Sequence, residues 1–415
     1  MNIIIIALRN LLRHKRRTAL TASLIALGVL IVILFGGIGN SFKKEVVGIL
    51  TNSSMGDLQI HRMGYVSSID NLPLNMYIPE QALVKVEGLL NENPDVAAYS
   101  ERIRFGGMLS NFSQTTNMRF TAIIPEKEIA TCPGLPSRIK EGSPDASSFL
   151  KPGQIVIPEN IATAMQLKVG SDVVLIATNK DGSVNGLNLT IAGVSENLQG
   201  PGAKDGYIHI EDATTLLRME GREISEIAVK LKDFNRLDTV AASLSETLSQ
   251  MKNQKSGKPI LELHTWEQLS PFSSIAKLIS ILLITVRIVL MFIVIVSVMN
   301  VMIMSVYERI GEIGTIAAIG TIPSKILALF LTEGVILGVA SALLGVLVSV
   351  GTLLVMSVIK LPIAFGRMEL QIAPQIPTFE VLLALVSVLV VSILASLEPA
   401  IKAARMEPVD ALRHV

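Results

Sequence analysis

The sequence predicts a membrane protein with four transmembrane helices and a large α+β domain inserted between the first and the second helix. Residues of hydrophobic type make up 50% of the 415 residues and charged residues only 17%, which is too apolar for one soluble domain. The mean hydropathy of +0.53 agrees with that class. The apolar residues gather in four blocks, each long enough for the ~20 residues that cross a bilayer as a helix: residues 18–39, 278–306, 326–359 and 379–397.

Composition and motifs exclude several functional classes. The formal net charge is +1 and no basic stripe with interleaved aromatic residues occurs, so nucleic acid is not an expected partner. The sequence has no G-x-x-x-x-G-K-[ST] phosphate loop, no H-E-x-x-H zinc motif and no G-x-S-x-G nucleophile elbow. The single Cys132 cannot form an intramolecular disulfide. We therefore expect a chain that is not an enzyme, binds no cofactor or metal, and depends on an outside energy source.

Residues 1–17 are expected to form a cytoplasmic N-terminal segment. Five basic residues precede the first apolar block, whereas the short loop at residues 360–378 holds only two, and basic residues favour the cytoplasmic side. The block at residues 18–39 is longer than the apolar part of a signal peptide and no A-x-A-like cleavage site follows it. It therefore reads as a retained transmembrane helix. Four crossings return the tail, residues 398–415, to the cytoplasmic side.

Residues 40–274 then lie outside the cytoplasm as one long insertion, in which acidic residues slightly outnumber basic ones. Short β-branched or alternating runs bounded by Gly, Pro, Asn and Asp predict strands. Helices are expected between them, for example behind Pro79 and Pro158. This pattern indicates a folded α+β domain. The expected strands include residues 57–61, 154–157, 172–177, 189–194, 207–210 and 226–231, and the expected helices residues 80–91, 159–166, 213–219 and 240–252.

The second apolar block is longer than a membrane requires. We expect residues 275–306 to form a stalk that continues as the second transmembrane helix. Arg287 then falls near the outer interface, where its side chain either reaches back to the interface or contacts a substrate.

The third transmembrane helix, residues 326–359, carries small residues at spacings that let helices approach closely in lipid. The sequence leaves open whether the partner helix belongs to this chain or to a second copy. Glu333 lies inside the same helix, where a carboxylate is costly, and either forms a structural hydrogen bond or takes part in coupling. The predicted packing residues are Gly334, Gly338, Ala342 and Gly345.

Residues 307–325 form the cytoplasmic connection between the second and third helices. Apolar residues follow helical spacing on one face, and three charged residues stand near the start, which predicts a short amphipathic helix. Such a helix either lies on the membrane surface alone or docks into a groove of a partner. The apolar residues are Ile310, Ile313, Ile316 and Ala317, and the charged ones are Glu308, Arg309 and Glu312.

This connection resembles the coupling segment of the FtsX-like, MacB-type permeases of ABC transporters, and the lipoprotein-releasing branch (LolC and LolE) is favoured. The matching pieces are residues 308–309, 312–314, 317–320 and 329–334. The tail at residues 398–413 is similar to the family pattern P-A-x-x-A-A-x-x-x-P-x-x-A-L-R, and residues 7–18 are similar to the family's opening. Ile310-Gly311 departs from the family, because relatives often carry a basic residue between the two acidic ones. The inserted domain resembles a MacB-like periplasmic core domain.

The resemblance implies a permease subunit of a type VII ABC transporter in a bacterial inner membrane, with both termini cytoplasmic and the large domain periplasmic. A separate cytoplasmic ABC ATPase, which binds ATP and magnesium, and a second permease copy or paralogue are the implied partners, with the lipid bilayer around them. A periplasmic acceptor or adaptor protein is a further candidate partner. The residues implied to contact the ATPase are Glu308, Arg309, Glu312, Ile313, Ile316, Ala317, Arg405, Pro408 and Leu412.

The resemblance leaves three kinds of work open. The first is mechanical extraction of lipoproteins or lipid-like substrates from the inner membrane, and it is the one we favour. The second is tripartite efflux of peptides or drugs through an adaptor, as implied by similarity to MacB. The third is an FtsX-like scaffold that activates a cell-wall hydrolase.

Overall fold

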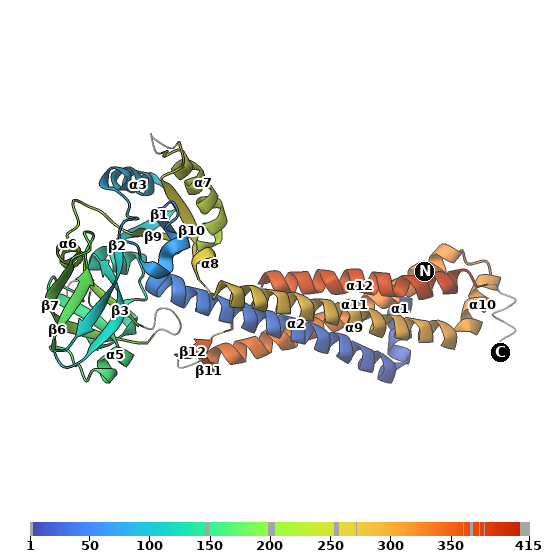
Figure 1. The fold of residues 1–415 in the computed structure, drawn as a ribbon. Helices are drawn as coiled ribbons and strands as arrows, with labels where there is room; N and C mark the ends of the chain where they lie inside the picture. Colours follow the sequence, from blue (N-terminus) through green and yellow to red (C-terminus); the bar gives the residue numbers. More distant parts are fainter. Residues whose placement is uncertain are drawn as a thin grey trace. The chain divides into compact units, whose positions relative to one another are not determined.

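The computed structural model describes residues 3–143, 145, 149–197, 204–252, 257–270, 272–359, 361–365, 368–372, 374–376 and 378–406 (Figure 1). The chain divides into two compact units. One unit, here called the membrane unit, contains residues 1–45 and 275–415, and the other, the outer unit, contains residues 46–274. Each unit is described by itself.

Four helices of the described chain are long and apolar enough to cross a membrane. Two of them, α2 and α9, have 36 residues each, and they run without interruption past the apolar blocks seen in the sequence. Shorter helices and a hairpin join them. The membrane unit contains most of α2 (Lys15–Leu50) and of α9 (Ser273–Glu308). It also contains α1 (Ile3–Arg13), α10 (Ile310–Ala318), α11 (Pro323–Ile359), the strands β11 (Leu361–Phe365) and β12 (Met368–Ile372), and α12 (Thr378–Ala404).

The four long helices of the membrane unit share one apolar core. Ile25 and Ile33 of α2, Val298 of α9, Phe330 of α11 and Val391 of α12 are all buried in it. In lipid, tight packing supplies the association energy that the hydrophobic effect supplies in water. The small residues of α11 make this packing close, because they let the backbone of α11 approach the neighbouring helices directly.

Two glycines of α11 face α12. A Cβ on Gly334 would lie 2.6 Å from Cβ of Ser396, and a Cβ on Gly338 would overlap Ser392. Gly345 faces α2 instead, where a Cβ would lie 2.6 Å from the carbonyl oxygen of Ala26. All three glycines therefore pack against helices of the same chain.

The outer unit is built on a ten-stranded mixed sheet with the order β10-β1-β9-β2-β3-β8-β5-β7-β4, to which β6 adds by pairing with β2 and β7. The β3–β8 and β5–β7 pairs are parallel. The strands are β1 (Leu58–Arg62), β2 (Val96–Ser110), β3 (Thr115–Ile123), β4 (Ile139–Gly142), β5 (Gln154–Pro158), β6 (Asp172–Thr178), β7 (Val184–Ser195), β8 (Asp205–His209), β9 (Glu226–Leu231) and β10 (Leu261–Thr265).

Helices cover the sheet of the outer unit. They are α3 (Glu80–Glu92), α4 (Pro125–Thr131), α5 (Glu159–Ala164), α6 (Ile210–Leu217), α7 (Leu237–Ser249) and α8 (Trp266–Leu269). Apolar faces of α3 and α7 are buried, as Leu83 and Leu244 illustrate. Four membrane helices with an inserted α+β domain confirm the predicted fold class.

The strand β2 joins the two halves of the sheet. Its first half, from Val96 to Arg102, pairs with β9, and its second half, from Ile103 to Ser110, pairs with β3. The sequence did not indicate this strand, because Gly106-Gly107 and several charged residues interrupt the alternation that marks a half-buried strand. Two of these charged residues, Glu101 and Arg102, lie where the halves meet and are buried there.

Candidate coupling site

The connection between α9 and α11 is a short helix held between two tight turns. Helix α9 ends at Glu308, Arg309 forms the turn, and α10 follows from Ile310 to Ala318. Gly320, with φ of +94°, reverses the chain in a conformation that glycine adopts without steric cost. Pro323 then begins α11, a position where its missing N–H group costs nothing.

The apolar face of α10 packs against the chain's own helices. Ile313 is buried with an exposure of 4%, Ile310 and Ile316 are half-buried, and Ala317 packs against the core of the membrane unit. Ile319, directly after α10, is an exposed apolar side chain, at 81%. A partner protein therefore has access to the end of α10 and to its charged side, rather than to Ile313.

Arg309 is the centre of an ion-pair network on this connection. Its Nε donates to Oε2 of Glu312 at 2.9 Å, and its Nη1 donates to Oε1 of Glu333 at 2.9 Å. The guanidinium carbon also lies 5.6 Å from the ring centre of Phe330. Burial lowers the pKa of Arg309, but the hydrogen bond to Glu312 and the charge of Glu333 outweigh burial, so the pKa lies above its ordinary value. Arg309 is therefore a fixed cation.

Glu333, which the sequence left between a structural and a coupling role, is buried on α11 with 1% exposure. Besides Arg309, it accepts a hydrogen bond from Nδ2 of Asn10 at 2.6 Å. A buried carboxylate with a cation and an amide donor is far less costly than an unpaired one. Glu333 thus ties α1 and the turn at Arg309 to the start of α11.

The N-terminal segment supplies further cations to the same network. Nη1 of Arg13 donates to Oε1 of Glu312 at 2.8 Å, and Nη1 of Arg17 donates to Oε2 of Glu308 at 2.5 Å. Hydrogen bonding from Arg309 first, and from Arg13 next, holds the pKa of Glu312 below its ordinary value. In the sequence, these arginines indicated only that the N-terminal segment is cytoplasmic. Their spacing of four residues, which matches that of Glu308 and Glu312, was the available signal of pairing.

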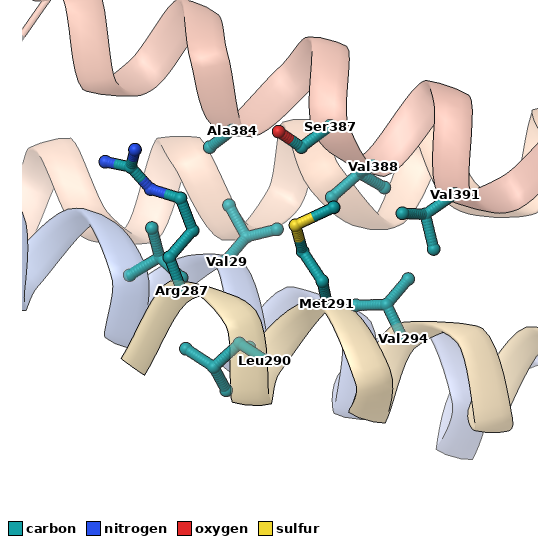
Figure 2. Close-up of a pocket in the computed structure, with 11 residues that line it drawn as sticks. Val29, Arg287, Leu290, Met291, Val294, Ala384, Ser387, Val388 and Val391 are labelled. Atoms are coloured by element: carbon teal, nitrogen blue, oxygen red, sulfur yellow. The ribbon is translucent and has the colours of Figure 1, made fainter. Parts of the chain in front are cut away.

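Arg287, the other residue with two interpretations, forms an ion pair inside the chain. Its partner is Glu380 of α12. Next to it lies a cavity of about 30 Å³ between α2, α9 and α12, lined mainly by apolar side chains such as Met291 and Val388. Figure 2 shows the guanidinium group at one end of this cavity and the side chain of Met291 reaching toward α12. Glu380 therefore supplies the counter-charge for an arginine within a membrane helix.

The tail is described only in part. Arg405 is exposed just after α12, while Pro408 and Leu412 lie outside the described residues. Within the described part of the chain, no three His, Cys, Asp or Glu side chains gather in a way that could hold a metal ion.

Four spanning helices, an inserted α+β domain and a charged connection define a polytopic membrane subunit with one large domain outside the spans. Residues 18–247 match the family model of the MacB-like periplasmic core domain, and residues 275–408 match that of the FtsX-like permease C-terminal region. The chain therefore belongs to the FtsX-like, MacB-type permeases, which are membrane subunits of ABC transporters. This confirms the resemblance seen in the sequence.

Relatives of two kinds are similar to this chain over nearly its whole length. The lipoprotein-releasing system transmembrane protein LolC of Xylella fastidiosa is 24% identical over 97% of this chain and 97% of its own length. The macrolide export ATP-binding/permease protein MacB 1/2 of Paracoccus denitrificans is 23% identical over 98% of this chain and 58% of its own length. The solved periplasmic region of MacB from Actinobacillus actinomycetemcomitans aligns with 54% of this chain and 93% of its own, at 14% identity and a TM-score of 0.38.

Proposed function

We propose that this permease works with a separate cytoplasmic ATPase, which binds ATP and magnesium, to extract lipid-anchored proteins or similar amphiphiles from the outer leaflet of the inner membrane. The observation that carries the proposal is the similarity to LolC, which extends over 97% of both chains. A second permease, identical or paralogous, completes the transporter. The termini and α10 lie on the cytoplasmic side.

Coupling in this proposal begins at the charged side of α10. The ATPase contacts Glu308 and Glu312 together with the tail, and displaces α10 when it binds and hydrolyses ATP. Arg309 bonds to Glu312 of α10 and to Glu333 of α11, and Glu333 also accepts a hydrogen bond from Asn10 of α1. A displacement of α10 therefore acts on α1, α9 and α11 together. The 36-residue α9 is continuous, so it carries the displacement along roughly 54 Å of helix at ~1.5 Å per residue.

The proposal is tested by removing the protein from cells and following lipid-modified proteins by membrane fractionation and mass spectrometry. We expect these proteins to accumulate in the inner membrane, and expression of the unaltered chain to restore their distribution. Expression of Glu312→Lys serves as a matched control that inserts in the membrane without coupling, and it is expected to leave the defect.

Efflux of peptides or drugs through an adaptor is the second candidate, because MacB proteins are also similar to this chain. An unchanged lipoprotein distribution, together with increased sensitivity to macrolides or peptides, would support efflux and contradict extraction.

A further inference from the structure

The outer unit contains a cavity of about 340 Å³ that neither the coupling site nor the family assignment explains. Its wall has two sides of different chemistry. One side is charged and comes from the central strands β2, β3, β8 and β9. The other side is apolar and includes Leu50, Met55, Leu269 and Phe272. The segments that supply this apolar side are the two at which the chain enters and leaves the outer unit.

Arg102 lies on the charged side, and all three of its guanidinium nitrogens donate hydrogen bonds within the outer unit. Its Nε and Nη2 bind both oxygens of Glu128, at 2.9 and 2.6 Å, and its Nη1 donates to Oε1 of Glu226 at 3.1 Å. Arg102 and both carboxylates are almost fully buried. Arg102 is therefore a structural residue that fixes Glu226 in the wall.

Arg104, two residues further along β2, differs from Arg102 in how its guanidinium group is bonded. The nearest carboxylate oxygens lie 3.6 Å away on Glu226 and 3.8 Å away on Asp205, beyond hydrogen-bonding distance. Its guanidinium group makes no hydrogen bond within the part of the chain that the structure describes, although it carries five N–H donors. The side chain is 19% exposed, and it lines the cavity. Its donors are thus available to a molecule in the cavity.

Arg119 on β3 stands on the same face as Arg104. In the β2–β3 ladder Arg104 pairs with Thr121, and side chains two residues apart on a strand share a face. Only Nε of Arg119 is used, in a hydrogen bond of 2.7 Å to Asp205. Tyr207, opposite Thr121 on β8, adds a hydroxyl group to the same row. Two guanidinium groups and two hydroxyl groups therefore converge on the cavity.

The charges around the cavity are nearly balanced, and this determines the kind of ligand. Although burial raises it, the charges of Arg104 and Arg102 hold the pKa of Glu226 well below its ordinary value. Asp70, Asp205 and Glu226 offset Arg102, Arg104 and Arg119 in the cavity wall, so a free anion gains little from the net charge. Directed N–H groups still favour phosphate or carboxylate oxygens, which match the planar guanidinium fork. Affinity must then come also from the apolar wall.

We propose that this cavity binds an amphiphile that carries a phosphate or carboxylate group, with Arg104 and Arg119 holding the anionic head and the apolar wall holding the start of the tail. Bound ligand contacts Leu50 and Leu269 together, and so it links the two segments that connect the outer unit to α2 and α9. The inference rests on the proposed function only in placing such an amphiphile within reach of the protein.

The test uses the full chain in phosphatidylcholine nanodiscs, and reads the fluorescence of its single tryptophan. Trp266 is buried on α8, one turn before Leu269. We expect the water-soluble lipid dihexanoyl phosphatidate to give a saturable change in emission. Arg104→Gln and Arg119→Gln should each weaken binding by about tenfold or more, because each loses a charge-assisted hydrogen bond. Lys85→Gln, a change of an exposed cation on α3 away from the cavity, should leave binding unchanged.

Two further ligands test separately whether the cavity needs the anionic head and whether it needs the apolar tail. Inorganic phosphate and the uncharged dihexanoylglycerol are both expected to bind much more weakly than the phosphatidate. Equal binding of inorganic phosphate would assign the site to a free anion and overturn the amphiphile. If dihexanoylglycerol binds as tightly as the phosphatidate, the proposal that Arg104 and Arg119 hold an anionic head is wrong.

Ser54→Phe provides a variant that fills the cavity and leaves every charge in place, since Ser54 lines the cavity. It should abolish binding while thermal unfolding shows a folded protein. Retention of binding by both Ser54→Phe and Arg104→Gln would overturn the proposal. The titration needs neither ATPase nor lipoprotein, so its result is independent of whether the extraction assay succeeds.

Discussion

Arg309 and Glu333 form a buried pair whose two halves depend on each other. Arg309 is 9% exposed and Glu333 is 1% exposed, so removing Arg309 leaves the buried carboxylate of Glu333 without its ion-pair partner. We expect Arg309→Met to lower the free energy of unfolding by about 3–5 kcal/mol, and the double variant with Glu333→Leu to recover most of that loss. Denaturant titration in mixed micelles measures both.

Lys402 and Glu398 supply the matched control for that pair, because their side chains are 66% and 63% exposed. Lys402→Met should leave the free energy of unfolding nearly unchanged, because water screens an exposed ion pair. A similar loss in Lys402→Met and Arg309→Met would show that the Arg309 pair contributes no more than a surface pair.

Glu312 and Ile319 are the residues at which contact with an ATPase is most directly tested. The side chain of Glu312 is 44% exposed, and Ile319 is 81% exposed. Glu312→Lys and Ile319→Asp should each abolish co-purification of the ATPase or uncouple its hydrolysis from transport, while insertion in the membrane persists, because a reversed or buried charge at an interface costs several kcal/mol. Ile313→Asp is the less specific variant, since Ile313 is buried within the chain itself.

Arg13→Gln distinguishes an ATPase contact from an internal one. The Arg13–Glu312 pair is exposed, so its loss should cost about 1 kcal/mol or less and leave Glu312 available to the partner. If Arg13→Gln loses the ATPase as completely as Glu312→Lys does, the effect of Glu312 passes through its pairing within the chain.

At the scale of elements, α11 is held against α12 and α2 by positions that have no room for a side chain. Gly338→Ala should lower the free energy of unfolding by about 1–3 kcal/mol, because the added Cβ overlaps Ser392 and the helices must separate. Gly351 lies on the same helix with no neighbouring atom within 4 Å of an added Cβ. Gly351→Ala should therefore be neutral or slightly stabilising, as helix propensity favours alanine by about 1 kcal/mol. Equal losses in the two variants would mean that α11 does not pack through Gly338.

At the scale of the whole molecule, the proposed function requires both termini on the side of the ATPase and the outer unit on the other side. Cysteine introduced at position 180 should react with a membrane-impermeant maleimide in intact cells, and cysteine at position 415 should react only after lysis. The native Cys132 is fully buried and gives little background. Reaction at both positions, or at 415 alone, would contradict this topology.

The sequence alone determined the four spanning helices and the family. Hydropathy is additive over a local window, so apolar blocks of sufficient length identify spans without any knowledge of their partners. The predicted strands at residues 154–157, 172–177 and 226–231 correspond to β5, β6 and β9, because their alternation and flanking turn residues are also local. The coupling motif was recognised for the same reason.

Only the tertiary structure decided which charges meet. Asn10 and Glu333 are 323 positions apart, and nothing within a local window indicates that they share a hydrogen bond. The cavity with Arg104 arises where the two halves of β2 join different strands, on a segment whose sequence did not read as a strand at all. A buried charge is tolerated only where packing brings its partner, and packing between distant segments depends on the complete fold.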